Sequence, residues 1–131
     1  MAIATQTILD GDRLAIFKFT NDSGTVETAA LKVDVATLKR NGAGLPCTGV
    51  KINKIWSGTH GMEVQILWDA TTDVLAWGLT QNSTYLMDFS SFGGIPNDAG
   101  AGKTGNVLFT TLDATAGDFY AITIEFLKTY G

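Results

Sequence analysis

The stretch MEVQILWDATTDVLAWGL, residues 62–79, decides the fold class of this chain. In its first half, the apolar residues Met62, Val64, Ile66 and Trp68 alternate with residues that are mostly polar. Successive side chains of a β-strand point to opposite faces of a sheet. This period of two therefore predicts an amphipathic strand with one buried face.

The second half of the stretch repeats the pattern after a turn. Residues 69–73 (DATTD) have the composition of a turn. Leu75, Trp77 and Leu79 then share one face of a second strand. Two amphipathic strands joined by a short polar turn predict an antiparallel β-hairpin.

The same period of two recurs along the rest of the chain. It predicts further strands at residues 6–9, 13–20, 31–35, 50–56, 85–89, 107–112 and 119–129. No segment of the sequence carries a long helical period, and residues 35–40 allow one helical turn at most. We therefore expect an all-β fold: a single-domain antiparallel β-sandwich or jelly-roll-like barrel of about eight strands over residues 1–131.

In three of these strands, alternate side chains separate into two distinct faces. Turns are expected on both sides of each strand, including one at residues 57–61 (SGTHG). In the strand at residues 13–20, one face carries Ala15, Phe17 and Phe19 and the other carries Leu14, Ile16 and Lys18. In the strand at residues 31–35, Leu31, Val33 and Val35 lie opposite a wet face. In the last strand, the expected core face carries Tyr120, Ile122, Ile124, Phe126 and Lys128.

Composition and charge argue against several classes of function. Hydrophobic residues make up 45% of the 131 residues, which is enough for a core, and the formal net charge is −4. Nucleic-acid-binding proteins need clustered Lys and Arg, whereas the nine basic residues here are scattered. No apolar run approaches the length that crosses a bilayer. We therefore expect neither nucleic acid nor a membrane as a partner.

The single cysteine and the first residues of the chain indicate the cellular compartment in which the chain is made. Cys47 is the one cysteine, so an intramolecular disulfide is excluded, and we interpret it as a small apolar residue. Residues 1–7 lack the basic segment and apolar stretch of a signal peptide. We therefore expect the chain to be made in a cytoplasm.

Residues 96–105, PNDAGAGKTG, look like a nucleotide-binding loop but lack two of its essential features. A P-loop carries a glycine five residues before its Gly-Lys-Thr, and Asn97 stands at that position. The loop must also begin a helix, whereas residues 106–112 are rich in β-formers and predict a strand. We interpret the stretch as a glycine-rich loop between strands.

Catalytic and metal-binding candidates are weak. His60 is the one histidine, and Glu63 is the one potential metal ligand close to it in sequence. Asp69 and Asp73 could act as a glycosidase acid pair, but aspartates that flank a turn more commonly bond its backbone. Three loop aspartates that could offer oxygen ligands to calcium, without EF-hand spacing, are Asp98, Asp113 and Asp118. We assign no catalytic, cofactor-binding or metal-binding residue and expect no enzyme activity.

The three tryptophans leave a carbohydrate-binding function open. Trp56, Trp68 and Trp77 lie in or beside the predicted central hairpin. Exposed tryptophans on a sheet could stack on sugar rings, whereas buried ones would belong to the core or to a subunit interface. Trp68 and Trp77 lie on regular strand faces, so we expect burial.

Several blocks of sequence, in a fixed order, resemble a known family. They are residues 53–56 (NKIW), 61–73 (GMEVQILWDATTD), 88–97 (DFSSFGGIPN), 102–105 (GKTG) and 109–111 (FTT). Together they resemble small virion structural proteins of tailed bacteriophages, especially phages of marine bacteria. The resemblance covers most of the chain from about Leu31 onward and includes no catalytic signature.

This resemblance implies a capsid decoration, or cement, protein that binds the outside of the assembled shell. The expected partner is the major capsid protein, and the expected location is the virion surface after synthesis in the host cytoplasm. Threefold sites of the shell would favour a homotrimer. A neck or tail accessory protein and a carbohydrate-binding module of the virion surface stay as alternatives.

Three segments are expected to make the contacts with the shell or with neighbouring subunits. Residues 1–9 are uncharged and could form an N-terminal arm that adds a strand to a neighbour's sheet. The loops at residues 39–49 and 90–105 are long and glycine-rich, and such loops are commonly functional. The expected contact residues are Ile3, Ile8, Leu9, Leu45, Phe92, Ile95 and Pro96.

Overall fold

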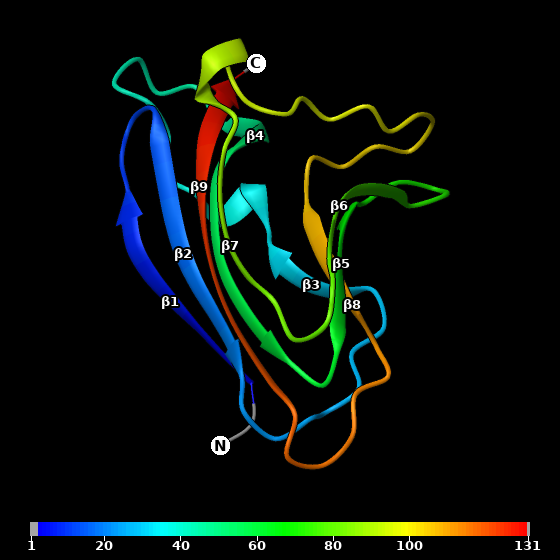
Figure 1. The fold of residues 1–131 in the computed structure, drawn as a ribbon. Helices are drawn as coiled ribbons and strands as arrows, with labels where there is room; N and C mark the ends of the chain where they lie inside the picture. Colours follow the sequence, from blue (N-terminus) through cyan, green and yellow to red (C-terminus); the bar gives the residue numbers. More distant parts are fainter. Residues whose placement is uncertain (1–2, 131) are drawn as a thin grey trace.

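The computed structural model describes residues 3–130, which fold into two antiparallel β-sheets (Figure 1). The first sheet has the order β1 (Ile3–Asp10), β2 (Leu14–Asn21), β9 (Phe119–Tyr130), β4 (Cys47–His60) and β7 (Thr84–Asp88). The second has the order β3 (Ala30–Val33), β8 (Val107–Leu112), β5 (Glu63–Trp68) and β6 (Val74–Leu79). Two 3-10 turns, η1 (Val35–Thr37) and η2 (Ser90–Phe92), lie in connections.

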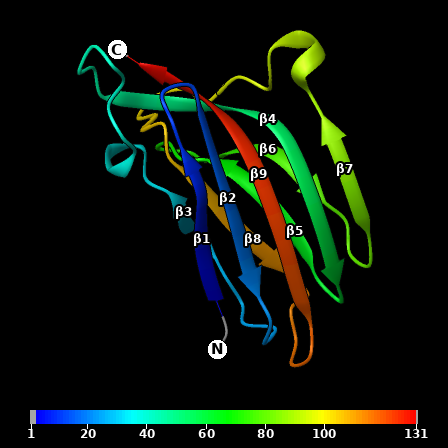
Figure 2. The same cartoon turned by 90° about the vertical axis from the view of Figure 1, so that its left-hand side faces the viewer.

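The predicted all-β class is confirmed, and of the two expected architectures the structure is a sandwich. Figures 1 and 2 show the sheets as two layers, and the described strands do not close into a barrel. Nine strands form, in agreement with the estimate of about eight, and each overlaps one of the segments predicted to be extended. Aromatic contacts join the layers: Phe109 of the second sheet lies edge-on to Phe19, at 5.1 Å between ring centroids, and to Tyr120, at 5.8 Å.

The hairpin of β5 and β6 confirms the main prediction and corrects one face assignment. Met62, Val64, Ile66 and Trp68 are all fully buried. Leu75, however, is 53% exposed, because a β-bulge interrupts the pairing: Ile66 lies opposite Trp77, and Leu67 lies opposite Leu75. One extra residue reverses the alternation, so Val74 packs against the core where Leu75 was expected.

A second irregularity corrects the expected face of the strand at residues 31–35. Val33 and Val35 are buried as predicted, but Leu31 is 54% exposed. The register shifts between Leu31 and Val33, so Lys32 turns inward instead. The strand also ends at Val33, and Val35 begins η1, in agreement with the single helical turn expected there.

Strand β4 is longer than predicted and forms the centre of the first sheet with β9. The turn expected at residues 57–61 is strand as far as His60, because β4 pairs with β9 and β7 over this range. The turn is confined to the residues around Gly61, which has a φ of +77° and leaves no room for a Cβ beside Asp118. In β9 the even-numbered set from Tyr120 to Lys128 faces the core, as predicted.

A buried polar cluster holds the crossing from β2 in the first sheet to β3 in the second. Glu27, in this connection, accepts hydrogen bonds through Oε1 from Tyr120 Oη at 2.6 Å and Asn21 Nδ2 at 3.2 Å. Its Oε2 forms an ion pair with Lys32 Nζ, and both side chains are almost completely buried. Glu27 also exchanges hydrogen bonds with Thr111 in β8. The cluster therefore connects both sheets with the segment that passes between them.

The chemistry of the cluster depends on the charge of Glu27. Burial and the hydrogen bond to Glu27 raise the pKa of the Tyr120 phenol well above its ordinary value. The phenol therefore stays protonated and donates to the carboxylate. The Lys32 ammonium also lies 5.6 Å from the centroid of the Phe109 ring, so its charge is stabilised from two sides.

Substituting Glu27 tests this cluster. Glu27→Gln keeps the shape of the side chain but leaves the buried ammonium of Lys32 without a counter-charge. We expect the free energy of unfolding, measured by urea denaturation, to fall by about 3–5 kcal/mol, the usual cost of breaking a buried ion pair from one side. Glu63→Gln at the start of β5 is the control and should change it by less than about 0.5 kcal/mol. Equal effects of the two substitutions would contradict this assignment.

Candidate functional site

The long connections gather at one end of the sandwich, which we call the loop-rich end (Figures 1 and 2). It consists of residues 10–13, 34–46, 69–73 and 89–106. Antiparallel strands place alternate connections at the same end, so segments far apart in sequence meet there.

A buried lysine fixes two of these connections. Lys128 Nζ donates hydrogen bonds to Asp10 Oδ1 at 2.7 Å, to Lys39 O at 2.8 Å and to Gly11 O at 2.9 Å. All three protons of the ammonium therefore have an acceptor. Burial opposes the charge, but the hydrogen bond to Asp10 and the influence of Tyr130 outweigh it and raise the pKa of Lys128. On the alkaline side, the clamp is therefore lost only when the pH rises through this raised pKa.

The glycine-rich loop at residues 96–105 is held against its surroundings by its backbone. Gly105, at a φ of +88°, approaches the Thr48 carbonyl so closely that a Cβ would overlap its oxygen. Thr104 N donates to Asp69 O, and Thr71 N donates to Ala101 O, both at 3.1 Å. The loop leads into strand β8, as predicted, and begins no helix.

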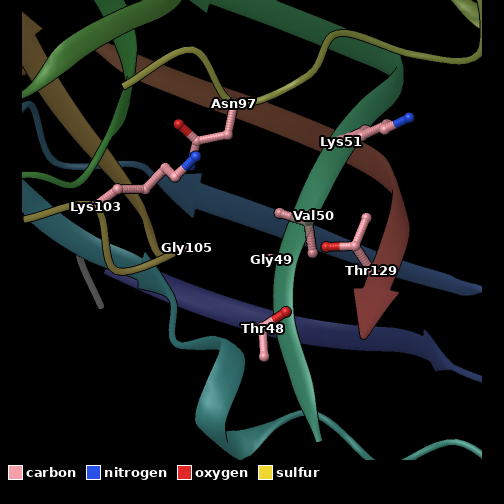
Figure 3. Close-up of a pocket in the computed structure, with 8 residues that line it drawn as sticks. All are labelled: Thr48, Gly49, Val50, Lys51, Asn97, Lys103, Gly105 and Thr129. Atoms are coloured by element: carbon pink, nitrogen blue, oxygen red, sulfur yellow. The ribbon is translucent and has the colours of Figure 1, made fainter. Parts of the chain in front are cut away.

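A pocket of about 290 Å³ lies between this loop and the beginning of β4 (Figure 3). Asn97 and Lys103 line it from the loop, and Thr48 and Lys51 line it from β4. Thr129, in β9, completes the wall behind Gly49. The sequence analysis assigned no ligand to these residues, because it tested the loop only against the P-loop pattern.

A second hollow, of about 450 Å³, lies on the outer face of the first sheet. Trp56, 38% exposed, lies opposite Thr123 in β9 and Leu86 in β7. Gly58 and Ala121, the next pair on this face, are small and leave the groove open. Trp56 is therefore the tryptophan available to a ligand.

The other two tryptophans are packed inward. Trp68 is completely buried, which confirms the expectation. Trp77 is partly buried and packs edge-on against Phe89, at 5.0 Å between ring centroids.

Most of the expected contact residues lie at or beside the loop-rich end. Leu45 is 48% exposed and Phe92 66% exposed, both in its loops. Pro96 is exposed on the same loop as Phe92, whereas Ile95 is partly buried because it pairs with Ile52 of β4.

The expected N-terminal arm takes a different form in the structure. Over its described part, from Ile3 onward, it is the edge strand β1 of its own sheet, because the turn after Asp10 closes a hairpin with β2. Ile8 and Leu9 are exposed near the loop-rich end, and Ile3 begins β1 at the opposite end. Met1 and Ala2 lie outside the described residues.

The candidate catalytic residues have structural partners. His60 is exposed and stacks on Phe119, at 5.4 Å between ring centroids. Asp73 accepts a hydrogen bond from Ala70 N within the hairpin turn, and Asp69 accepts one from Thr104. The distances are 3.1 Å and 2.8 Å, so the pair stabilises the turn and its contact with the glycine-rich loop.

Of the three candidate calcium ligands, Asp118 has hydrogen-bond partners within its own loop. Asp118 accepts hydrogen bonds from the Thr115 amide and hydroxyl. Within residues 3–130, no group of three or more His, Cys, Asp or Glu side chains is placed to hold a metal ion. Cys47 is buried, and burial raises the pKa of its thiol.

Two comparisons with known proteins give no match. No protein-family profile matches the sequence, and no curated protein does either. Within the described part of the chain, no helix is long and apolar enough to cross a membrane.

A glycine substitution tests how the loop is held. Gly105→Ala places a methyl group against the Thr48 carbonyl and forces alanine into a left-handed φ. We expect the free energy of unfolding, measured by thermal or urea denaturation, to fall by about 1–3 kcal/mol. Gly100→Ala, in the same loop, meets open space and should stay within about 0.5 kcal/mol of the wild type. If Gly105→Ala left the free energy of unfolding unchanged, the loop would not need this contact.

Proposed function

We propose that this chain is a non-enzymatic structural protein of a tailed-phage virion: a capsid decoration protein that binds the outer surface of the assembled shell and stabilises it. Its partner is the major capsid protein, and it acts as a homo-oligomer, with a trimer favoured. The observation that carries the proposal is the gathering of exposed apolar side chains at the loop-rich end. The resemblance of the sequence blocks to virion proteins supports it.

The loop-rich end has the character of a docking surface. Leu45, Phe92 and Pro96 are exposed on two separate loops of the same end. Burying such side chains against a partner releases water from apolar surface, at about 25 cal/mol per Å². The surface is also held in place, because Lys128 and the close packing of Gly105 fix both loops. A rigid surface loses less conformational entropy on binding.

Strand β1 supports the association of copies. Its residues from Ile3 to Leu9 carry no charge, and its outer edge pairs with no other strand among the described residues. An edge strand exposes backbone donors and acceptors, and charged residues usually protect it. The edge of β1 is therefore suited to adding a strand to a neighbouring sheet.

The stabilising effect follows from mass action. A protein that binds the assembled shell better than its separate subunits shifts the equilibrium toward assembly. Many copies on a symmetric shell make modest contacts effective together. The number of copies therefore distinguishes a decoration protein from a neck or tail accessory protein.

The first test is the copy number of this protein in purified particles, by quantitative mass spectrometry against the major shell protein. We expect near parity with the shell subunit. A copy number of roughly six to a few dozen would instead indicate a ring-forming neck or tail component. Absence from particles would contradict the virion role.

A surface substitution tests the docking end. Phe92→Asp places a charge in the proposed interface, and we expect at least about tenfold weaker binding to purified shells in co-sedimentation. Val26→Asp is the matched control, because Val26 is an exposed apolar residue in the connection at the opposite end. Circular dichroism checks that both variants fold. Equal binding by the two variants would contradict docking through the loop-rich end.

A second candidate function, carbohydrate binding, rests on the groove at Trp56. An exposed indole beside a floor of small residues offers a stacking surface for a sugar ring. We expect oligosaccharides of bacterial surfaces to shift the tryptophan emission saturably, with millimolar affinity, about −4 kcal/mol. Trp56→Ala should lose this binding, and Phe92→Ala should retain it. Equal affinity of Trp56→Ala and the wild type would contradict this function.

A further inference from the structure

We propose that the pocket between the glycine-rich loop and β4 binds a small oxyanion, a carboxylate or a phosphate group. The inference rests on the pocket alone and does not depend on the virion role. Its lining residues include two lysines and no Asp or Glu. Among the described residues, ion pairs form at Lys32 and Lys128, so neither Lys51 nor Lys103 has a carboxylate partner there.

Asn97 supplies the strongest local evidence. Its Oδ1 accepts a hydrogen bond from Ala99 N at 2.9 Å, which sets the orientation of the amide. The Nδ2 atom at the other end of the amide is buried and has no acceptor among the described residues. A buried donor without an acceptor costs about 1–3 kcal/mol, so a ligand oxygen placed here would restore this free energy.

Lys103 shares the same space. In the view of Figure 3 its side chain extends from the loop toward Asn97, and both residues line the pocket. An anionic oxygen in the pocket suits both an amide donor and an ammonium. Lys51 also lines the pocket, but its side chain extends away from Lys103 in Figure 3, so Lys103 is the cation that the proposal uses. Asp98 follows Asn97 in sequence but is exposed and does not line the pocket.

The opposite wall adds hydroxyl groups. Thr48 and Thr129 line the pocket from β4 and β9, and a hydroxyl can donate a hydrogen bond to an anion. The loop that carries Asn97 and Lys103 is fixed on both sides, because Ile95 pairs with Ile52 and Gly105 packs on Thr48. The backbone that carries both donors is therefore held in position before a ligand arrives.

The size of the pocket selects a small ligand. A volume of about 290 Å³ lies at the lower limit of ligand sites in proteins. It suits a phosphate or an acidic side chain better than a nucleotide, and no helix follows the loop to hold a chain of phosphates. In this proposal, Lys103 of the GKT sequence binds the anion, although the loop does not have the geometry of a P-loop.

The test is a titration of the ¹⁵N-labelled protein with inorganic phosphate and, separately, with acetate, at constant ionic strength. We expect the side-chain amide resonances of Asn97 to shift saturably. Lys103→Met should weaken binding at least tenfold. Asn97→Asp keeps the acceptor for Ala99 but replaces the free donor by a charged oxygen, so its backbone resonances should show no saturable shift. Lys54→Met is the control, because Lys54 lies opposite Glu125 and Asp88 outside the pocket, and it should bind like the wild type.

The two titrations also distinguish the source of the anion. Tighter binding of phosphate would indicate a free or esterified phosphate, and comparable binding of acetate would indicate the acidic side chain of a docked protein. The absence of a saturable shift with both probes would overturn the proposal. Wild-type affinity in Lys103→Met and Asn97→Asp would overturn it as well. Neither result would affect the shell-binding test, which probes Phe92.

Discussion

The buried ion pair of Glu27 and Lys32 is the constraint on which the two-layer structure depends. Two charges inside a core are tolerated only when their hydrogen-bonding capacity is met by fixed partners. Glu27 meets this condition through Tyr120 and Asn21 of the first sheet, while Lys32 belongs to the second. The two sheets can therefore close in one relative position, which also sets where the connections at the other end meet.

At the loop-rich end, a second buried charge is likewise stabilised by fixed hydrogen-bond partners. Lys128 is buried with all its donors satisfied, and this fixes the turn after β1 and the loop before β4. The contrast with the pocket at Asn97 is informative. There, the buried Nδ2 of Asn97 has no acceptor in the described part of the chain.

The sequence predicted the fold class because period two is a local property, as the buried residues Val64, Ile66 and Trp68 of β5 show. It failed at Leu75 and Leu31, where a single bulged residue reverses the alternation, and pairing partners decide bulges. The length of β4 was also missed, since β9 is more than 50 residues away in sequence. The Glu27 cluster and the Asn97 pocket join residues of separate segments, so no local pattern could reveal them.

The position of β9 has a consequence for how the protein folds during its synthesis on the ribosome. β9 lies between β2 and β4 in the first sheet, yet it follows every other strand in the chain. The earlier strands therefore leave the exit tunnel before the strand that joins them exists. Until then, β2 and β4 each present an open edge that would attract other nascent chains. The first sheet can therefore be completed only after β9 has been made, a step at which a chaperone would have its greatest effect.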